Sequence, residues 1–400
     1  AVHPRAVVTL ALAVVLAATL IDLPQRPVEA AARKPDIVLF YIDDFAPYPA
    51  RMWNGPARTP EISRFAGQGL VFTNAIASTP LCGPSRANML TGRYGHNNRV
   101  TQNSIRPYDP QESVSPRLRS QGYKTVFIGK HMNRLKDVYP TRRAMNRLAS
   151  HWDRFDVMWE NQGRAYGWTQ FRRHGTREYG YGSLQHSTYV SAKRAAAVID
   201  NSKRPTPLFM VVSLVDGHKP LTPLERFRGH PSCQGIGRWA GPAFNEADLS
   251  DKPRHMRATP RLPITSYPLR QRCEQLLTVD WAIATVRKAL GRSGRLGNTL
   301  QVLTADNGWL MGDHRLEGKT YPYATGVPLM MQWPTVIGTK GRRLREPVSN
   351  VDLAPTFCAV AGCRLPAADG QSLLPLIGGT GTRLDRRFLY VEMLHANRYY

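Results

Sequence analysis

Four segments of the chain are almost uninterrupted runs of apolar residues, and polar or charged side chains follow each of them. The runs span residues 35–42, 125–128, 208–214 and 299–304. Short continuous apolar runs are typical of strands that are buried on both faces of a parallel sheet. The sequence therefore predicts four central strands. The residues that follow them are Asp43-Asp44, Gly129-Lys130, Asp216-Gly217-His218 and Asp306-Asn307.

Stretches with helical spacing of apolar residues lie between these runs. Helices are predicted over 60–67, 115–122, 189–199, 269–290 and 348–361. Alternating strands and helices favour an α/β fold with a large, mostly parallel or mixed sheet sandwiched by helices. Ligands bind such sheets at the carboxyl ends of the strands. We therefore expect the polar residues that end the four strands to form one site.

Other segments show weaker patterns. Residues 141–183 and 230–263 lack clean periodicity, and we interpret both as loops around a cleft. A strand is predicted over 388–391. We expect three parts in the chain: a signal peptide over 1–32, a catalytic domain over 33–340, and a small α+β C-terminal subdomain over 341–400 that is partial and truncated.

The amino terminus has the pattern of an export signal. Arg5 precedes an uncharged apolar run over 6–20, and Ala30-Ala31-Ala32 provides small residues for cleavage. The run is shorter than the ~20 residues that a membrane helix needs. A retained anchor is the alternative. Because no second such run exists, we expect a secreted, extracytoplasmic protein with no stable membrane span in its mature form.

The charge of the chain favours anionic partners. The 400 residues carry a formal net charge of +25, which attracts sulfated sugars, nucleic acids or anionic membranes. The arginines are scattered, and no block of Lys and Arg interleaved with aromatic residues marks a nucleic-acid surface. We therefore expect no nucleic-acid partner.

The cysteine count suits an oxidising compartment. Of the 5 cysteines, four are candidates for disulfides. They allow three pairings that the sequence does not distinguish, although the short spacing favours a bond between Cys358 and Cys363; reduced, buried cysteines are the alternative. The four candidates are Cys233, Cys273, Cys358 and Cys363.

Two acidic pairs suggest a metal site. Asp43-Asp44 and Asp306-Asn307 each supply two hard oxygen ligands, which suit Ca²⁺ or Mg²⁺. Either pair alone is common in turns, but both follow buried strands here. Fixed positive charge and a proton donor are also needed to cleave an anionic ester. The candidates for these roles are Arg86, Lys130, His218 and Lys319.

The most specific motif is Leu81-Cys82-Gly83-Pro84-Ser85-Arg86, followed by Leu90-Thr91-Gly92-Arg93. It resembles the two-part signature of the type I sulfatases of the alkaline-phosphatase superfamily. The resemblance covers most of residues 35–376. The run over 91–97 is similar to the N-acetylglucosamine-6-sulfatase and extracellular sulfatase branch, with the arylsulfatases close to it. An alkaline-phosphatase-like fold is the implied architecture.

The resemblance also implies a cofactor chemistry. Cys82 would be oxidised to formylglycine (3-oxoalanine) by a formylglycine-generating enzyme, a transient partner. Four oxygen-bearing side chains would bind the divalent ion together with residue 82, and a hydroxyl of the hydrated aldehyde would attack sulfur. His218 or Lys319 would protonate the leaving alcohol, while Arg86 and Lys130 would orient the nucleophile. The implied metal ligands are Asp43, Asp44, Cys82, Asp306 and Asn307.

The sequence departs from the family pattern at two places. Many sulfatases have a histidine two residues after the lysine of the third strand, where this chain has Met132. Its neighbour His131 is expected to point the other way, so the residue that assists sulfate elimination is unassigned. The segment Asp216-Gly217-His218-Lys219-Pro220 replaces the usual A-P-H-x-P but keeps the histidine.

The expected function is that of a secreted sulfatase. Its substrate would be a sulfated carbohydrate or an aryl sulfate. Two alternatives remain open at this stage. One is a formylglycine-dependent phosphonate monoester or phosphodiester hydrolase, and the other is a catalytically impaired relative that binds polyanions.

Overall fold

The protein is represented by a computed structural model that describes residues 33–46, 59–234, 243–263, 269–319, 321–381 and 383–393. Residues from Pro35 onward form a compact unit. The predicted signal peptide lies outside the described residues. Among the described residues, no helix has both the length and the apolar character needed to cross a bilayer.

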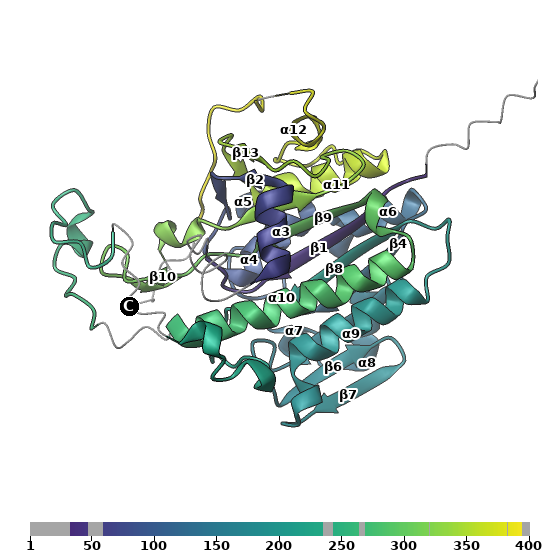
Figure 1. Cartoon of the computed structure of the whole chain (residues 1–400), viewed down its shortest axis with the longest axis horizontal. Helices are drawn as coiled ribbons and strands as arrows, with labels where there is room; N and C mark the ends of the chain where they lie inside the picture. The colour runs from purple at the N-terminus through teal and green to yellow at the C-terminus, as the bar shows by residue number, and fades with distance from the viewer. Residues whose placement is uncertain are drawn as a thin grey trace, which may run out of the picture. The chain divides into compact units, whose positions relative to one another are not determined.

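A ten-stranded mixed sheet forms the centre of this unit (Figure 1). Its strand order is β13-β2-β12-β9-β1-β8-β4-β5-β6-β7, and the five strands from β9 to β5 run parallel. Two two-stranded sheets, β10-β11 and β14-β3, accompany it. The strands of the main sheet are β1 (Asp36–Ile42), β2 (Leu70–Phe72), β4 (Lys124–Gly129), β5 (Arg154–Glu160), β6 (Trp168–Arg172), β7 (Gly175–Tyr179), β8 (Leu208–Leu214), β9 (Thr299–Ala305), β12 (Leu329–Gln332) and β13 (Arg342–Leu344).

The four predicted central strands are confirmed as β1, β4, β8 and β9. Their side chains are almost entirely buried, as continuous apolar runs require. The register aligns Ile42 with Leu214 and Ala305, and Gly129 with Ser213. Because these strands are parallel and end at the same level, the polar residues after them emerge along one edge of the sheet.

Helices cover both faces of the sheet (Figure 1). On one face α9 packs along α10, which also contacts α3. On the other, α4, α6 and α11 contact one another. The predictions for 60–67, 115–122, 189–199 and 269–290 are confirmed. The helices are α3 (Pro60–Gln68), α4 (Cys82–Thr91), α5 (Gly95–Asn98), α6 (Val114–Ser120), α7 (Leu135–Val138), α8 (Arg142–Ala149), α9 (Ser187–Asp200), α10 (Leu269–Arg292), α11 (Leu353–Ala361) and α12 (Leu374–Gly378).

Two expectations about local structure are wrong. Residues 141–183 are not simply loops, because they contain α8 and the strands β5, β6 and β7 that extend the sheet. Strand β7 exposes three consecutive residues, so its sequence lacks a buried run. Residues 388–391 form no strand: Phe388 and Tyr390 are exposed, and the segment is irregular. In 230–263, the described residues form loops and short 3₁₀ turns, as expected.

The carboxyl-terminal part is joined closely to the rest of the chain. The helix predicted over 348–361 starts only at Leu353, because Val348 and Ser349 form β14 beside β3 (Ala75–Ile76). Strand β13 belongs to the main sheet through β2. The proposed domain boundary at residue 340 stays a prediction.

Two disulfides join the four candidate cysteines. One links Cys233 to Cys273, and the other links Cys358 to Cys363. Among the described residues this leaves Cys82 as a free, buried thiol. The Cys358–Cys363 bond that the short spacing favoured is therefore present, and the two remaining candidates form the second bond.

Candidate active site

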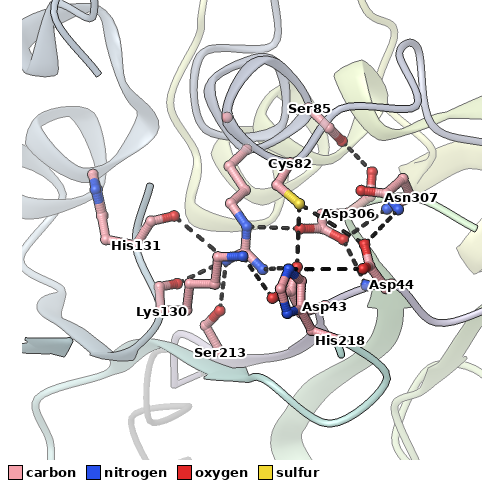
Figure 2. Close-up of polar contacts among 12 residues, drawn as sticks. Asp43, Asp44, Cys82, Ser85, Lys130, His131, Ser213, His218, Asp306 and Asn307 are labelled. Carbon is pink, nitrogen blue, oxygen red and sulfur yellow. Dashed lines mark hydrogen bonds and ion pairs between the residues drawn. The ribbon is translucent and has the colours of Figure 1, made fainter. Parts of the chain in front are cut away.

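The strand ends and the first turn of α4 form one buried cluster (Figure 2). Ligand atoms of Asp43, Asp44, Cys82 and Asp306 all lie within 4.8 Å of one another. These residues come from β1, α4 and β9, which are distant in the sequence. The structure thus brings together the candidate metal ligands that the sequence indicated.

The backbone at the end of β1 is shaped to hold the acidic pair. Asp44 has a φ of 50°, a left-handed conformation that Asp tolerates better than most residues. Gly217, which follows β8, passes so close that an added Cβ would lie 2.2 Å from the Asp43 carbonyl oxygen. A side chain at position 217 would therefore displace the Asp43-Asp44 turn.

The oxygen atoms of this cluster fit a hard divalent cation. Asp44 Oδ2 and Asn307 Oδ1 are buried, and neither accepts a hydrogen bond from the described residues. Asn307 Nδ2 donates to Asp44 Oδ1 over 2.8 Å, which orients both side chains. Two buried acceptors without donors are costly unless an ion or another group satisfies them. Asp43, Asp44, Asp306 and Asn307 are therefore the residues that could hold Ca²⁺ or Mg²⁺.

Two buried cations brace the carboxylates. Arg86 Nε donates to Asp306 Oδ2 over 2.8 Å, and its Nη1 donates to the Lys130 carbonyl over 2.7 Å. Lys130 Nζ donates to Asp43 Oδ2 over 2.6 Å. Both cations are almost fully buried. They fix the acidic groups and leave Lys319 and His218 nearer to the open side.

Cys82 begins α4 and faces both acids and a cation. Its Sγ lies 3.3 Å from Asp43 Oδ1 and 2.7 Å from Lys319 Nζ. Lys319 Nζ also donates to Asp44 Oδ1 over 2.5 Å. A helix amino terminus favours negative charge. An oxygen nucleophile in place of this sulfur would therefore have both the helix end and Lys319 to stabilise its charge.

His218 is placed to exchange protons at the edge of the cluster. Its Nδ1 lies 2.5 Å from the carbonyl oxygen of Lys219, so Nδ1 carries the proton in the neutral ring. Its Nε2 lies 4.0 Å from Asp44 Oδ2, and the side chain is 29% exposed. His218 is therefore the group of the cluster with the easiest access to a leaving alcohol.

His131 lies outside the site, as the sequence suggested. Figure 2 shows its ring directed away from the carboxylates. The ring is buried against Phe127 and Phe155, with centroid distances of 4.8 and 5.1 Å. Burial lowers its pKa to about 3, so it stays neutral. Met132 is also fully buried.

The electrostatics of the site follow from burial and opposite charges. Burial opposes ionisation of Asp43, but the positive charges of Lys130, His218, Arg86 and Lys319 outweigh it and hold its pKa well below the usual range. Burial raises the pKa of Asp306 to about 7, and repulsion from Asp43 and Asp44 adds to this effect. Burial also raises the pKa of the Cys82 thiol well above its ordinary value. The unmodified thiol is thus a poor nucleophile.

Sequence reasoning missed a supporting network of neutral side chains. Ser213 Oγ accepts from Arg86 Nη1 over 2.8 Å. Ser85 Oγ donates to the Asp306 carbonyl, and Asn350 Nδ2 donates to Ser85 Oγ over 2.8 Å. Ser85 lies within the Cys82 motif, but no pattern marks Ser213 or Asn350 as partners of a site. These residues fix the relative positions of α4, β8 and β9.

Comparison with known proteins defines the class. The Sulfatase family model matches residues 35–363. The chain belongs to the sulfatase family. The family and its named relatives confirm the predicted class, a sulfuric ester hydrolase.

Named relatives include enzymes that act on sulfated sugars. N-acetylglucosamine-6-sulfatase of Homo sapiens is 26% identical over 390 residues, covering 91% of this chain and 68% of the human protein. The extracellular sulfatase SULF-1 homolog of Drosophila melanogaster is 28% identical over 368 residues, covering 87% of this chain and 32% of the fly protein. The chain therefore spans only part of the length of either relative.

Solved structures confirm the fold. BT4656, solved with its substrate D-glucosamine-2-N,6-O-disulfate, superposes with a TM-score of 0.69 at 22% identity, covering 88% of this chain and 82% of that one. A phosphonate monoester hydrolase from Silicibacter pomeroyi superposes with a TM-score of 0.61 at 21% identity, covering 86% and 77%. The predicted alkaline-phosphatase-like α/β fold is thus confirmed.

Proposed function

We propose that the protein is a secreted sulfatase that hydrolyses sulfate esters of a sugar, using a formylglycine made from Cys82 and a divalent cation. One observation carries this proposal: Cys82 Sγ lies within hydrogen-bond distance of Asp43 and Lys319 at the start of α4. The two disulfides support export, because such bonds persist in oxidising compartments.

The nucleophile would arise from the aldehyde at position 82. Hydration gives a geminal diol, and one hydroxyl, which has released its proton to water, attacks the sulfur of the ester. A divalent cation held by the site would lower the pKa of that hydroxyl. Asp43 and Lys319 lie within reach of the position that Sγ marks, so they orient the diol and balance its charge.

Two proton transfers complete the cycle. The S–O bond to the sugar breaks as the leaving oxygen takes a proton from His218 or Lys319. The second hydroxyl then loses its proton, the bond between residue 82 and sulfate breaks, and the aldehyde returns as sulfate leaves. His218 Nε2 faces the cluster and is partly exposed, so it supports the role of leaving-group acid and, in the neutral form, of elimination base.

A hollow beside His218 supports a sugar substrate. Its volume is about 470 Å³, and its walls include Arg164, Tyr166, Tyr181 and Pro220. Its wall residue Arg164 follows Gly163, where an added Cβ would lie 2.8 Å from the His218 ring, so the wall comes close to that histidine in the chain. The two tyrosine rings stack with centroids 6.3 Å apart. Aromatic faces next to a guanidinium suit a sugar ring with anionic substituents.

The test is to produce the chain with and without a formylglycine-generating enzyme. Mass spectrometry of the peptide that carries position 82 should show the aldehyde only in the first sample. Only that sample should hydrolyse 4-nitrophenyl sulfate and N-acetylglucosamine 6-sulfate, and Cys82→Ala should abolish both activities. Full activity with an unmodified Cys82 would overturn the proposal.

Parallel assays of the converted protein separate the two alternative functions, a phosphonate hydrolase and a polyanion-binding protein. Faster cleavage of aryl phosphonate esters than of sulfates would favour the phosphonate hydrolase reading. Heparin binding without hydrolysis of any sulfate ester by the converted protein would favour a binding protein that has lost turnover.

A further inference from the structure

A second hollow lies at the edge of the sheet opposite to the catalytic cluster. Its volume is about 540 Å³. Five cationic side chains and two carboxylates line it. The cations are Lys124, Arg154, Arg172, Arg173 and Arg194, and the acids are Asp153 and Asp156. We call it the arginine pocket.

Strand topology explains why these cations meet. Lys124 begins β4 and Arg154 begins β5, which runs parallel to it. Strand β6 is antiparallel to β5 and ends at Arg172, so the β6–β7 turn with Arg173 returns to the same edge. Lys130 follows the other end of β4. At about 3.3 Å per residue, Lys124 and Lys130 lie roughly 20 Å apart.

The two carboxylates are already neutralised within the protein. Asp156 Oδ2 accepts from Arg154 Nε over 2.7 Å and from Arg194 Nη2 over 2.8 Å. Asp153 Oδ1 lies 3.2 Å from Arg119 Nε, and its Oδ2 accepts from the backbone N–H of Thr125 over 2.8 Å. Asp153 also acts on the charge of Lys124, but five cations against two carboxylates leave the hollow with a net positive charge.

The other three cations are Lys124, Arg172 and Arg173. Among the described residues, the first two donate hydrogen bonds only to neutral oxygens, and Arg173 donates none. Lys124 Nζ donates to Ser202 Oγ over 3.1 Å. Arg172 donates to Gln170 Oε1 and Tyr179 Oη over 2.9 and 2.8 Å. Within the described part of the chain, none of Lys124, Arg172 and Arg173 forms an ion pair. Burial lowers the pKa of Lys124, and the neighbouring charge of Arg154 adds to this.

We propose that the arginine pocket binds the sulfate or carboxylate groups of a sulfated glycan, as a site separate from the catalytic centre. The identity of this ligand rests on the proposed function. Guanidinium groups match such oxyanions in bidentate geometry. A separation of roughly 20 Å exceeds one sugar ring, so the pocket would hold another part of a chain and raise avidity.

The lining of the pocket favours a glycan over a nucleic acid. Two aromatic rings belong to its lining: Phe155, which is 1% exposed and cannot stack on a base, and His174, a single exposed imidazole. Single-stranded nucleic acids are held largely by such stacking on exposed aromatic rings. Positive charge in a hollow with one exposed ring instead fits discrete anionic substituents on a polar ring.

The test compares two double variants of the full chain with Cys82 left unconverted, so that no turnover occurs. Arg172→Ala/Arg173→Ala removes two charges from the pocket. The control, Arg142→Ala/Arg143→Ala, removes the two charges of adjacent, exposed arginines on α8. Calorimetry with a heparin-derived tetrasaccharide should show about tenfold weaker binding for the pocket variant alone, the loss expected for charge-assisted hydrogen bonds.

A second pair protects the test against misfolding of the hairpin. Arg173→Glu changes an exposed side chain, and Arg143→Glu is its control. Equal losses in pocket and control variants would overturn the proposal. Tighter, pocket-dependent binding of an oligonucleotide of equal charge would overturn the glycan assignment.

Kinetics separates this proposal from the proposed function. In converted protein, the pocket variants should hydrolyse 4-nitrophenyl sulfate at the unaltered rate and show a raised KM only for longer sulfated oligosaccharides. If the unaltered chain hydrolyses no sulfate ester, the proposed function is wrong. The binding comparison still tests whether the arginine pocket binds a sulfated glycan.

Discussion

At the scale of single residues, Arg86 combines a structural and a chemical task. It joins the ends of three strands through Asp306, the Lys130 carbonyl and Ser213. Its charge is almost fully buried. A buried ion pair contributes little by itself relative to apolar packing, but loss of one partner leaves the other charge buried and uncompensated.

We therefore expect Arg86→Ala to destabilise the fold by about 3–5 kcal/mol. Urea unfolding followed by circular dichroism measures this loss. Arg64→Ala is the control, because Arg64 is 42% exposed and pairs with Glu61 at the surface; its cost should stay within about 0.5 kcal/mol. A loss below 1 kcal/mol for Arg86→Ala, on the scale of such surface changes, would contradict a bracing role.

The choice between His218 and Lys319 as leaving-group acid can be decided by kinetics. Removal of a general acid slows the reaction by about 10²–10⁴-fold, and most for alcohols that leave poorly. We expect His218→Ala to slow hydrolysis of a sugar sulfate far more than that of 4-nitrophenyl sulfate. Lys319→Ala, which removes a charge next to Cys82 and Asp44, should slow both alike. The reverse pattern would assign the acid to Lys319.

The site residues differ in how far the sequence can reveal them. Asp43, Asp306 and Cys82 carry signals because they follow apolar runs or lie in a specific motif. Ser213 and Asn350 carry none, since a neutral side chain that braces Arg86 or Ser85 can occur wherever the fold brings it close. Contacts between segments over a hundred residues apart are set by strand order, which the pattern of apolar residues does not specify.

At the scale of elements, α3 is capped by a residue of another helix. Its own N-cap, Thr59, forms no side-chain cap. Asp280 of α10 instead accepts from the backbone N–H groups of Glu61 and Ile62 over 2.9 and 2.8 Å. Burial raises the pKa of Asp280 to about 7. The contact therefore ties α3 to α10 and makes their packing sensitive to pH.

This pKa predicts a pH dependence of stability. The folded form holds the Asp280 proton up to about pH 7, whereas the unfolded chain releases it near pH 4. The contribution of Asp280 to folding stability is thus complete below pH 4 and is lost as the pH rises toward 7. Asp280→Asn keeps an acceptor oxygen without a charge. Between pH 5 and pH 8, its free energy of unfolding should rise by roughly 1–3 kcal/mol relative to that of the unaltered chain, as measured by urea unfolding. If the two proteins differed by the same free energy of unfolding at pH 5 and at pH 8, the raised pKa would be refuted.

The central elements could be predicted and the edge elements could not, for one physical reason. Strands β1 and β8 are buried on both faces, so their sequences are apolar throughout. Strand β7 lies at the edge of the sheet and exposes three residues in a row. Its Thr-Arg-Glu sequence reads as a loop. Residues 388–391 have the apolar composition of a strand but pair with no other strand among the described residues.

At the scale of the whole molecule, metal binding and folding should be linked. The candidate ligands come from β1 and β9, and they are held by α4 through Arg86. An ion that binds the folded chain alone stabilises it by about 2.7 kcal/mol at a concentration of 100 times its Kd. Chelation should lower the Tm, and Ca²⁺ or Mg²⁺ should restore it.

Asn307→Ala provides the matched control for this measurement. It removes one buried oxygen without a donor and the bond to Asp44. Its Tm should respond less to the restored ion than that of the unaltered chain. Equal responses would show that the ion binds elsewhere.

The burial of Cys82 sets an order of events in the cell. In the finished fold it is 1% exposed, and Asp43 and Lys319 from two distant segments of the chain contact its sulfur. An enzyme that oxidised Cys82, as the proposed function requires, would have no path to that sulfur once the sheet has closed. The proposed conversion would therefore have to happen during synthesis or transport, while the peptide is still extended. A molecule that folds too early would stay a permanently silent copy, with an intact architecture and no remaining opportunity for activation.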